Sequence, residues 1–214
     1  MRPRLHNVVS YGVTLLVFLG VLLWRERAAS WSLSAELSAA LWSAHFLRRS
    51  LESAFVHRYS KPRVGPSDYL TEYLYYWCFG AWIAWSLSAR SALEPALWLR
   101  ASGLVLFVAA EAGNARAHWI LRRLRSPGGR EKLVPHGFLF ERVSCPHYFF
   151  EILSWLGFNL VVPSLAGVLF MLVGAGILAS WAHTRHVAYR RELDGQDGRE
   201  SYPAHRRALI PFLF

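Results

Sequence analysis

Long apolar runs alternate with short charged segments along the whole chain. The first run, 8–24, is apolar apart from Ser10 and Thr14, and the charged triplet at 25–27 ends it. About 20 residues at ~1.5 Å rise per residue cross the hydrocarbon core of a bilayer, so this run predicts a membrane-spanning helix. Comparable runs follow at 31–56, 69–88, 96–121, 148–162 and 164–182.

The run pattern predicts an all-α, polytopic membrane helix bundle of about six transmembrane helices. Lipid offers no hydrogen-bond partner to the backbone, so each span should be helical. Pro163 separates the last two runs, because proline cannot continue a helix without losing a hydrogen bond. Arg2 and Arg4 also resemble the charged start of a signal peptide, but no small-x-small cleavage site follows, which favours a span.

Charge and composition support a membrane protein. The chain has 214 residues, with 24 Lys+Arg against 14 Asp+Glu, 54% hydrophobic residues and 15% aromatic residues, which excludes a disordered chain. A basic, aromatic-rich composition fits either nucleic acid or membrane, and the apolar runs favour membrane and no nucleic acid. Seventeen Lys and Arg residues fall in the two termini and alternate loops, against three in the opposite loops. This asymmetry predicts that both termini are cytoplasmic.

Polar side chains inside the predicted spans are candidate functional residues, because such groups are costly in lipid and usually face a cavity. Four helices carry them at helical spacing toward the expected cytoplasmic ends. We expect these stripes to converge on one arginine-lined pocket that suits a phosphate-bearing ligand. The stripes comprise His45, Arg48, Arg49 and Glu52; Glu111, Asn114, His118, Arg122 and Arg125; Tyr148, Glu151 and Trp155; and Arg185, His186, Tyr189 and Arg190.

Plainer interpretations exist for each feature. Single Tyr, His or Arg residues near helix ends often anchor a helix at the interface, and polar stripes can hold helices together without any catalysis. His183 and His186 lack a nearby carboxylate or cysteine companion, so we expect no metal site. Gly174 and Gly176 match a dinucleotide-binding string, but no strand precedes them, so close helix packing is the better interpretation.

Several motifs occur in order along most of the chain. They are HFLRR at 45–49, LESAFVHRYS at 51–60, YYW at 75–77, GN at 113–114, LRRLRSPG at 121–128, VSCPHYFFE at 143–151 and LIPFLF at 209–214. Together they resemble the steroid 5α-reductase superfamily, closest to the branch of very-long-chain trans-2-enoyl-CoA reductases. The resemblance covers about residues 40–214.

The resemblance implies a single membrane-embedded reductase domain, 1–214, without the ubiquitin-like region that eukaryotic enoyl reductases carry. It also implies NADPH-dependent reduction of a C=C bond conjugated to a carbonyl, foremost trans-2-enoyl-CoA to saturated acyl-CoA. Tyr148 matches the catalytic tyrosine of that branch. The cofactor-binding positions would be Asn114, His118, Arg122, Arg125, His147, Glu151, Arg185, His186 and Tyr189, and the substrate-binding positions Tyr11, His45, Phe46 and Tyr76.

Two departures bear on the substrate. Phe46 stands where the steroid-reducing branch has Tyr, and Ser10 stands where an acidic residue is usual. The alternatives are a 3-oxo-4-ene steroid or polyprenoid reductase of the same fold, an isoprenylcysteine-type methyltransferase and a structural membrane protein. The methyltransferase motif would read Arg-His-Pro-x-Tyr, where this chain has CPHY at 145–148.

The expected setting is a multi-pass protein of the bacterial inner membrane or the endoplasmic reticulum, with its site open to the cytoplasm. Its expected partners are membrane lipid and a lipid-like acyl-CoA, steroid or isoprenoid substrate. The sequence leaves the oligomeric state open.

Overall fold

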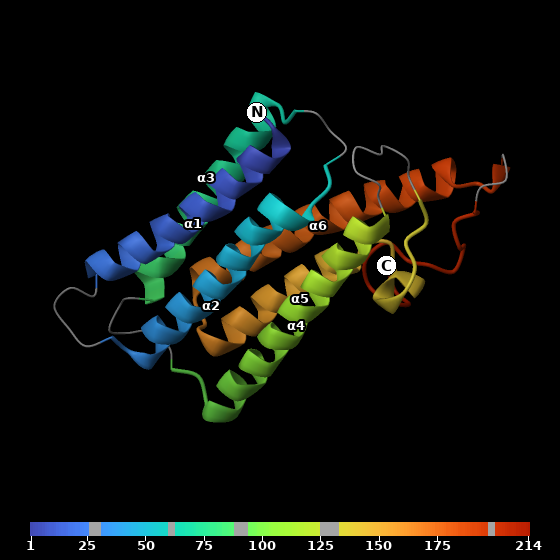
Figure 1. The fold of residues 1–214 in the computed structure, drawn as a ribbon. Coiled ribbons are helices and arrows are strands. Elements are labelled where there is room, and N and C mark those ends of the chain that lie inside the picture. The colour runs from blue at the N-terminus through green and yellow to red at the C-terminus, as the bar shows by residue number, and fades with distance from the viewer. Residues whose placement is uncertain (26–30, 60–62, 88–93, 125–132, 197–199) are drawn as a thin grey trace.

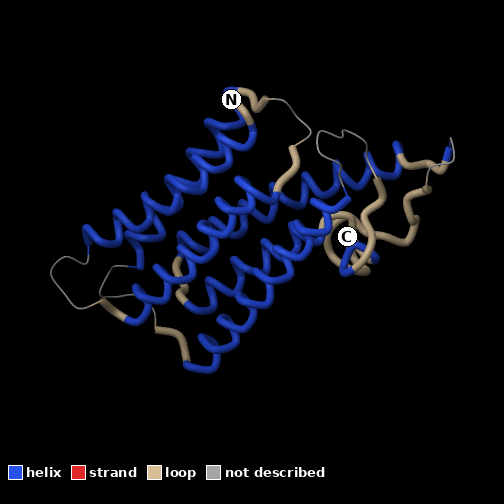
Figure 2. The backbone as a smooth tube through the Cα atoms, in the orientation of Figure 1, coloured by secondary structure: helices blue, strands red, loops and turns tan. Residues whose placement is uncertain are grey.

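The computed structural model describes residues 1–25, 31–59, 63–87, 94–124, 133–196 and 200–214. These residues form an all-α membrane helix bundle, with two isolated β-bridges and no strand among them (Figures 1 and 2). The elements are α1 (Pro3–Arg25), α2 (Leu33–Leu51), the π-helix η1 (Glu52–Val56), α3 (Pro66–Leu87), α4 (Leu97–Leu124), the 3-10 helix η2 (Phe138–Glu141), α5 (Pro146–Val161) and α6 (Leu165–Glu192).

The predicted runs all become helices, with two differences at their ends. The last helix continues ten residues past 182 to Glu192, because its charged end extends beyond the apolar run. The second run does not stay α-helical to 56, since a π-helix begins at Glu52. The break at Pro163 is confirmed, and Ser164 caps α6 by accepting a hydrogen bond from the Gly167 amide at 3.0 Å.

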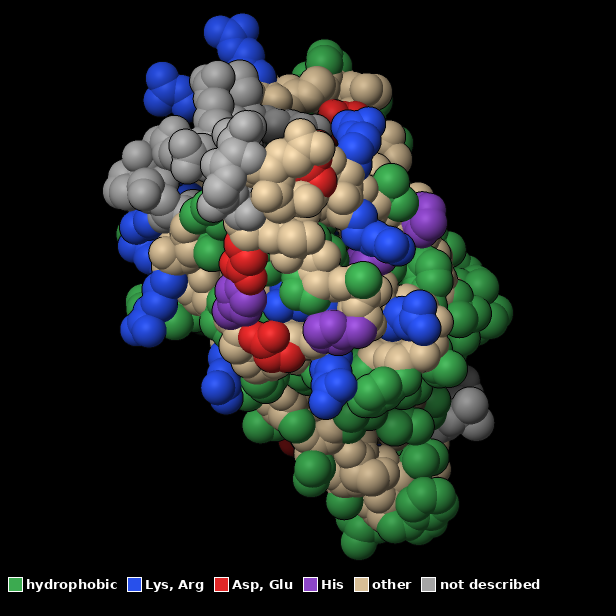
Figure 3. All heavy atoms as spheres, turned by 90° about the vertical axis from the view of Figure 1, so that its right-hand side faces the viewer, with side chains coloured by type: hydrophobic (Ala, Val, Ile, Leu, Met, Phe, Trp, Pro, Cys, Tyr) green, Lys and Arg blue, Asp and Glu red, His purple; other side chains and the backbone are tan. Residues whose placement is uncertain are grey.

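Apolar side chains cover much of the outside of the bundle. α1 and α6 are long and apolar enough, over the described residues, to cross a membrane. Leu16, Val105 and Leu165 are between 68% and 71% exposed on the outer surface. On the face that Figure 3 shows, the charged and histidine side chains gather in the upper and middle part, and apolar side chains predominate toward the bottom. Such a distribution suits contact with lipid and would be unusual in water.

An aromatic core and a close helix pair hold the bundle together. Phe18 of α1 stacks on Trp42 of α2 at 4.5 Å between ring centroids, and both are fully buried. α4 and α5 approach so closely that a Cβ on Gly103 would lie 2.9 Å from the Gly157 carbonyl oxygen. Larger residues at either glycine would push the two helices apart.

Both chain ends lie at the same end of the bundle. The Met1 amino group donates to the Val64 carbonyl at 3.2 Å, just before α3 begins. The C-terminal segment runs beside the start of α5, where the Ser144 amide donates to the Arg207 carbonyl at 2.8 Å. In Figure 1, α2, α4 and α6 end, and α3 and α5 begin, toward this end. An even number of crossings fits this arrangement, while the side of the membrane on which the termini lie stays a prediction.

Candidate functional site

A buried ionic network joins α2, α4 and α5. His45, which is 1% exposed, lies between two carboxylates, with Nδ1 2.8 Å from Glu111 Oε1 and Nε2 3.1 Å from Glu151 Oε1. Arg48 donates from Nε to Glu111 at 2.7 Å and from Nη1 to the Asn114 side-chain oxygen at 3.0 Å. The opposite charges satisfy one another away from water, so the three helices are fixed in register at this level.

Arg49, next along α2, binds a second group of residues. Its Nη1 donates to Glu52 at 2.7 Å and lies 2.9 Å from His118 Nε2, while Nη2 donates to the Tyr11 hydroxyl at 3.3 Å. The π-helix places Glu52 within reach of this guanidinium. π-helical turns are frequent at functional sites. Arg49 thereby ties α1, α2 and α4 to one point.

α5 begins directly beside this network. Pro146 takes the first helical position, where its missing N–H costs nothing. Asn114 of α4 donates from Nδ2 to the His147 carbonyl at 2.7 Å and to Glu151 Oε2 at 3.0 Å. The start of α5 is therefore held from α4 on one side and from the C-terminal segment on the other.

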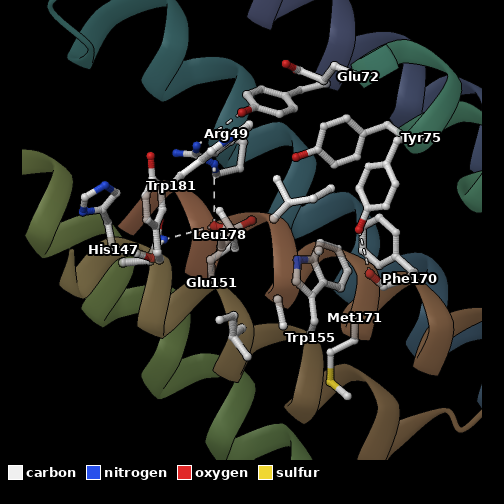
Figure 4. A pocket seen from close by; sticks show the side chains of 18 of the residues that line it. Arg49, Glu72, Tyr75, His147, Glu151, Trp155, Phe170, Met171, Leu178 and Trp181 are labelled. Carbon is white, nitrogen blue, oxygen red and sulfur yellow. Dashed lines mark hydrogen bonds and ion pairs between the residues drawn. The ribbon is translucent and has the colours of Figure 1, made fainter. Parts of the chain in front are cut away.

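One cavity of about 570 Å³ opens beside the network. Figure 4 shows Arg49, His147 and Glu151 on one side of it and Trp155, Phe170 and Met171 on another. A polar wall and an apolar wall therefore face the same space. The lining also includes Tyr11, Tyr76, Asn114, His118 and Tyr148, the α3 residues Asp68, Glu72 and Tyr75, and Leu178 and Trp181 of α6.

Tyr148 sits in the first turn of α5 and lines this cavity. Its ring is 4.2 Å from the His147 ring, and the Arg185 guanidinium carbon lies 5.8 Å from its centroid. A cation over a phenol ring stabilises negative charge on the phenol oxygen. The site thus places the Tyr148 phenol beside a neighbouring positive charge.

Comparison with known proteins places this architecture in a family. The family model for 3-oxo-5-alpha-steroid 4-dehydrogenase matches residues 96–214, which is more than half of the chain. This chain belongs to that family. The matched region contains α4, α5 and α6. In the cavity, α4 supplies Asn114, and α5 supplies His147, Tyr148 and Glu151.

Relatives that are named as reductases align with most of the chain. It is 35% identical over 182 residues to a very-long-chain enoyl-CoA reductase of Dictyostelium discoideum, covering 85% of this chain and 59% of the relative. A probable very-long-chain enoyl-CoA reductase of Caenorhabditis elegans is 32% identical over 188 residues, covering 84% and 59%. A polyprenal reductase of Xenopus tropicalis is 33% identical over 197 residues, covering 85% and 62%. The chain spans about three fifths of the length of these relatives.

The structure brings some predicted site residues to the cavity and leaves others away from it. His45 and Phe46 are buried behind the wall and do not line the cavity. Arg125 lies outside the described residues. The predicted residues that line the cavity are Tyr11, Tyr76, Asn114, His118, His147, Tyr148 and Glu151.

The remaining four predicted cofactor-binding residues do not line the cavity and have contacts elsewhere. Arg122 donates to the carbonyls of Phe55 and Val56, so it caps the end of the π-helix. His186 shares a 2.6 Å hydrogen bond with the Ser144 hydroxyl, and Tyr189 stacks on Tyr202 at 5.3 Å. Arg185 reaches Tyr148 without lining the cavity. Among the described residues, the predicted arginine lining is therefore limited to Arg49.

Sequence reasoning gave no cofactor-binding or substrate-binding role to Arg49, Glu72 or Trp155, although all three line the cavity. Arg49 and Trp155 already stood in the polar stripes, and their helical spacing was the available signal. For Glu72 the available signal was the helical spacing of Asp68, Thr71, Glu72 and Tyr75, which the sequence analysis did not use.

Two further groups near the site are a possible metal-binding cluster and a buried cysteine. Glu52, His57 and His118 bring one nitrogen or oxygen atom each within 4.8 Å of one another, but Arg49 already places its cation against two of them. Burial raises the pKa of the Cys145 thiol to about 12, so this cysteine stays a protonated core group at neutral pH.

Proposed function

We propose that this chain is a single NADPH-dependent reductase domain that reduces the conjugated C=C bond of a lipid-like trans-2-enoyl thioester. The observation that supports this most is one cavity in which Tyr148 and a polar wall with Arg49 face an apolar wall, while Arg185 lies beside Tyr148. The names of the relatives point in the same direction. The proposed setting is a multi-pass membrane protein with the site open to the cytoplasm.

The residues at the polar wall fit a polyanionic nicotinamide cofactor. Arg49 lines the cavity and Arg185 lies beside it, and arginine binds phosphates with paired hydrogen bonds. His147 Nδ1 is a buried nitrogen atom with no hydrogen-bond partner among the described residues, and His147 lines the cavity. This nitrogen, with Asn114, would hold the cofactor, which supplies hydride when bound.

The chain's own residues would manage charge and water. The Tyr148 hydroxyl would donate to the thioester oxygen as negative charge develops there, with Arg185 stabilising the phenol oxygen. Trp155, Phe170 and Met171 would hold the acyl chain and exclude water from the reacting bond. Tyr148 is the residue that we assign to catalysis.

A second candidate is a neutral acceptor such as a polyprenal. Asp68 and Glu72 line the cavity, and their negative charges would repel the phosphates of CoA. The resemblance to a polyprenal reductase agrees with this possibility. A 3-oxo-4-ene steroid is the third acceptor that a test should include.

The full chain in lipid nanodiscs, given NADPH and one acceptor at a time, tests the proposal. We expect NADPH oxidation with trans-2-enoyl-CoA and none with the matched saturated acyl-CoA. If NADPH is oxidised only with polyprenal or only with the steroid, that compound is the substrate and the enoyl thioester is not. No oxidation with any acceptor, by protein that remains folded, would contradict the assignment as a reductase.

A further inference from the structure

A second acidic group faces the cavity from the side opposite the ionic network. Glu72 of α3 lines the cavity, and its side chain is 26% exposed. In Figure 4, Glu72 and Tyr75 lie on one side of the cavity and His147 and Glu151 on the other. Glu151 is already bound by His45 and Asn114, whereas Glu72 belongs to a separate cluster.

Glu72 is joined to a buried histidine. His6 of α1 is 3% exposed, and its Nε2 lies 2.9 Å from Glu72 Oε2. The other ring nitrogen, Nδ1, lies 3.2 Å from the Tyr73 hydroxyl, which fixes the ring orientation. Imidazole and carboxyl groups are side chains that commonly transfer protons in enzymes, and one hydrogen bond joins the two groups here.

The pair lies between the N-terminal end of the bundle and the cavity. His6 lies one turn from the start of α1, at the end of the bundle where Met1 is 43% exposed. On the cavity side, the Glu72 carboxylate interacts electrostatically with the phenols of Tyr11 and Tyr76, which also line the cavity. A proton that enters at His6 therefore needs one transfer to reach a cavity-lining carboxyl group.

We propose that His6 and Glu72 supply the proton that each reduction consumes, an inference that rests on the proposed reductase function. Reduction of a conjugated C=C bond adds a hydride at the β-carbon and leaves an electron pair shared between the α-carbon and the carbonyl oxygen. Tyr148 stabilises that oxygen. The α-carbon still requires a proton. Asp68 and Glu72 are the carboxyl groups that α3 contributes to the cavity, and Glu72 is the one bonded to a buried histidine.

The step balances as a single proton transfer. The electron pair of the enolate forms the new C–H bond at the α-carbon while the O–H bond of the Glu72 carboxyl group breaks. The resulting carboxylate takes the proton from His6 Nε2 along the 2.9 Å hydrogen bond. As Nε2 gives up its proton, His6 takes one at Nδ1 from the Tyr73 hydroxyl, 3.2 Å away, and that hydroxyl takes one from water at the N-terminal end of the bundle.

Paired variants test this role. Glu72→Gln and His6→Gln should each lower steady-state turnover by at least about 100-fold, the lower limit for a lost acid–base group. The double variant should be no slower than the worse single variant, since both remove one pathway. Glu200→Gln is the matched control, because it removes the carboxylate of a 2.7 Å pair with His136 outside the cavity.

Histidine ¹⁵N NMR of the full chain provides a measurement independent of turnover. We expect Glu72→Gln to shift the His6 Nε2 resonance and its titration, and Glu200→Gln to leave both unchanged. Turnover within twofold of the unaltered chain in Glu72→Gln, or an unshifted His6 resonance, would overturn the proton-supply role while leaving the reductase function standing. No turnover in the unaltered chain would overturn both.

Discussion

Two buried arginines show how differently the same residue can be used. Arg49, 9% exposed, bonds to Glu52, His118 and Tyr11 and lines a cavity. Arg206, 1% exposed, donates to the Pro135 carbonyl at 2.8 Å and does not line that cavity. Burial of a cation is therefore no sign of a site by itself. What distinguishes Arg49 is the cavity beside it, which a ligand could occupy.

The acidic partners of the two regions differ in the same way. The Glu111 and Glu151 side chains of the ionic network are 13% and 14% exposed. Glu141, which accepts from Arg206 at 3.1 Å, is 48% exposed. Water already screens the second pair, whereas the first depends on its protein partners. One region should be sensitive to charge removal and the other tolerant.

The same substitution in both regions gives the largest expected contrast. Glu111→Ala leaves His45 and Arg48 buried without their shared partner, so we expect a loss of about 3–5 kcal/mol in the free energy of unfolding. Glu141→Ala should lose less than about 1 kcal/mol. Denaturant unfolding of the full chain in detergent measures both. Equal losses would remove the distinction between the two regions.

Removal of one hydroxyl should reduce catalysis without loss of folding. Tyr148→Phe keeps the ring against His147, so folding and NADPH binding should persist while kcat falls by at least ~100-fold. Tyr11→Phe, Tyr75→Phe and Tyr76→Phe are the companions, because all three tyrosines line the cavity. If one of them is inactive and Tyr148→Phe is active, the catalytic assignment moves to that tyrosine.

A cation at the site should affect cofactor affinity more than one in the C-terminal segment. Arg185→Ala should raise the Kd for NADPH by about 10–100-fold, as a lost charge-assisted contact of about 1.5–3 kcal/mol would. Arg142→Ala, whose guanidinium lies 5.4 Å from the Phe212 ring, is the control. Thermal stabilisation reports both, and NADPH should stabilise more than NADH if arginine binds the 2′-phosphate. Unchanged affinity in Arg185→Ala would exclude that residue from the cofactor site.

The smallest expected effect is a pH dependence in the C-terminal region. The Gly137 amide, with Arg206 and His136 nearby, lowers the pKa of the Glu141 carboxyl group. Because the folded-state pKa lies below the unfolded one, this contribution is present above the unfolded value near 4.3 and is lost as pH falls through the folded value. Glu141→Gln should therefore flatten acid-side unfolding by less than about 1 kcal/mol. An unchanged acid limb would show that the Gly137 contact contributes nothing.

Much of the bundle could be predicted from the sequence, because apolar run length depends on local composition. Each of the six runs became a helix, and Pro163 ended one where its missing N–H required it. The stripe on α4 correctly indicated Asn114 and His118, since residues three to four apart share a helical face. The π-helix at Glu52–Val56 could not be predicted, as it depends on neighbours such as Arg122.

What the sequence by itself determined is the membrane class, the helix order and the family, because these follow from apolar length, charge sorting and ordered motifs. Only the tertiary structure decided which polar residues share a cavity. Spacing along one helix cannot tell that Tyr189 packs on Tyr202, or that Glu72 meets His6 from another helix. Those contacts depend on how helices distant in sequence rotate and approach, and close contacts such as Gly103 against Gly157 set that approach.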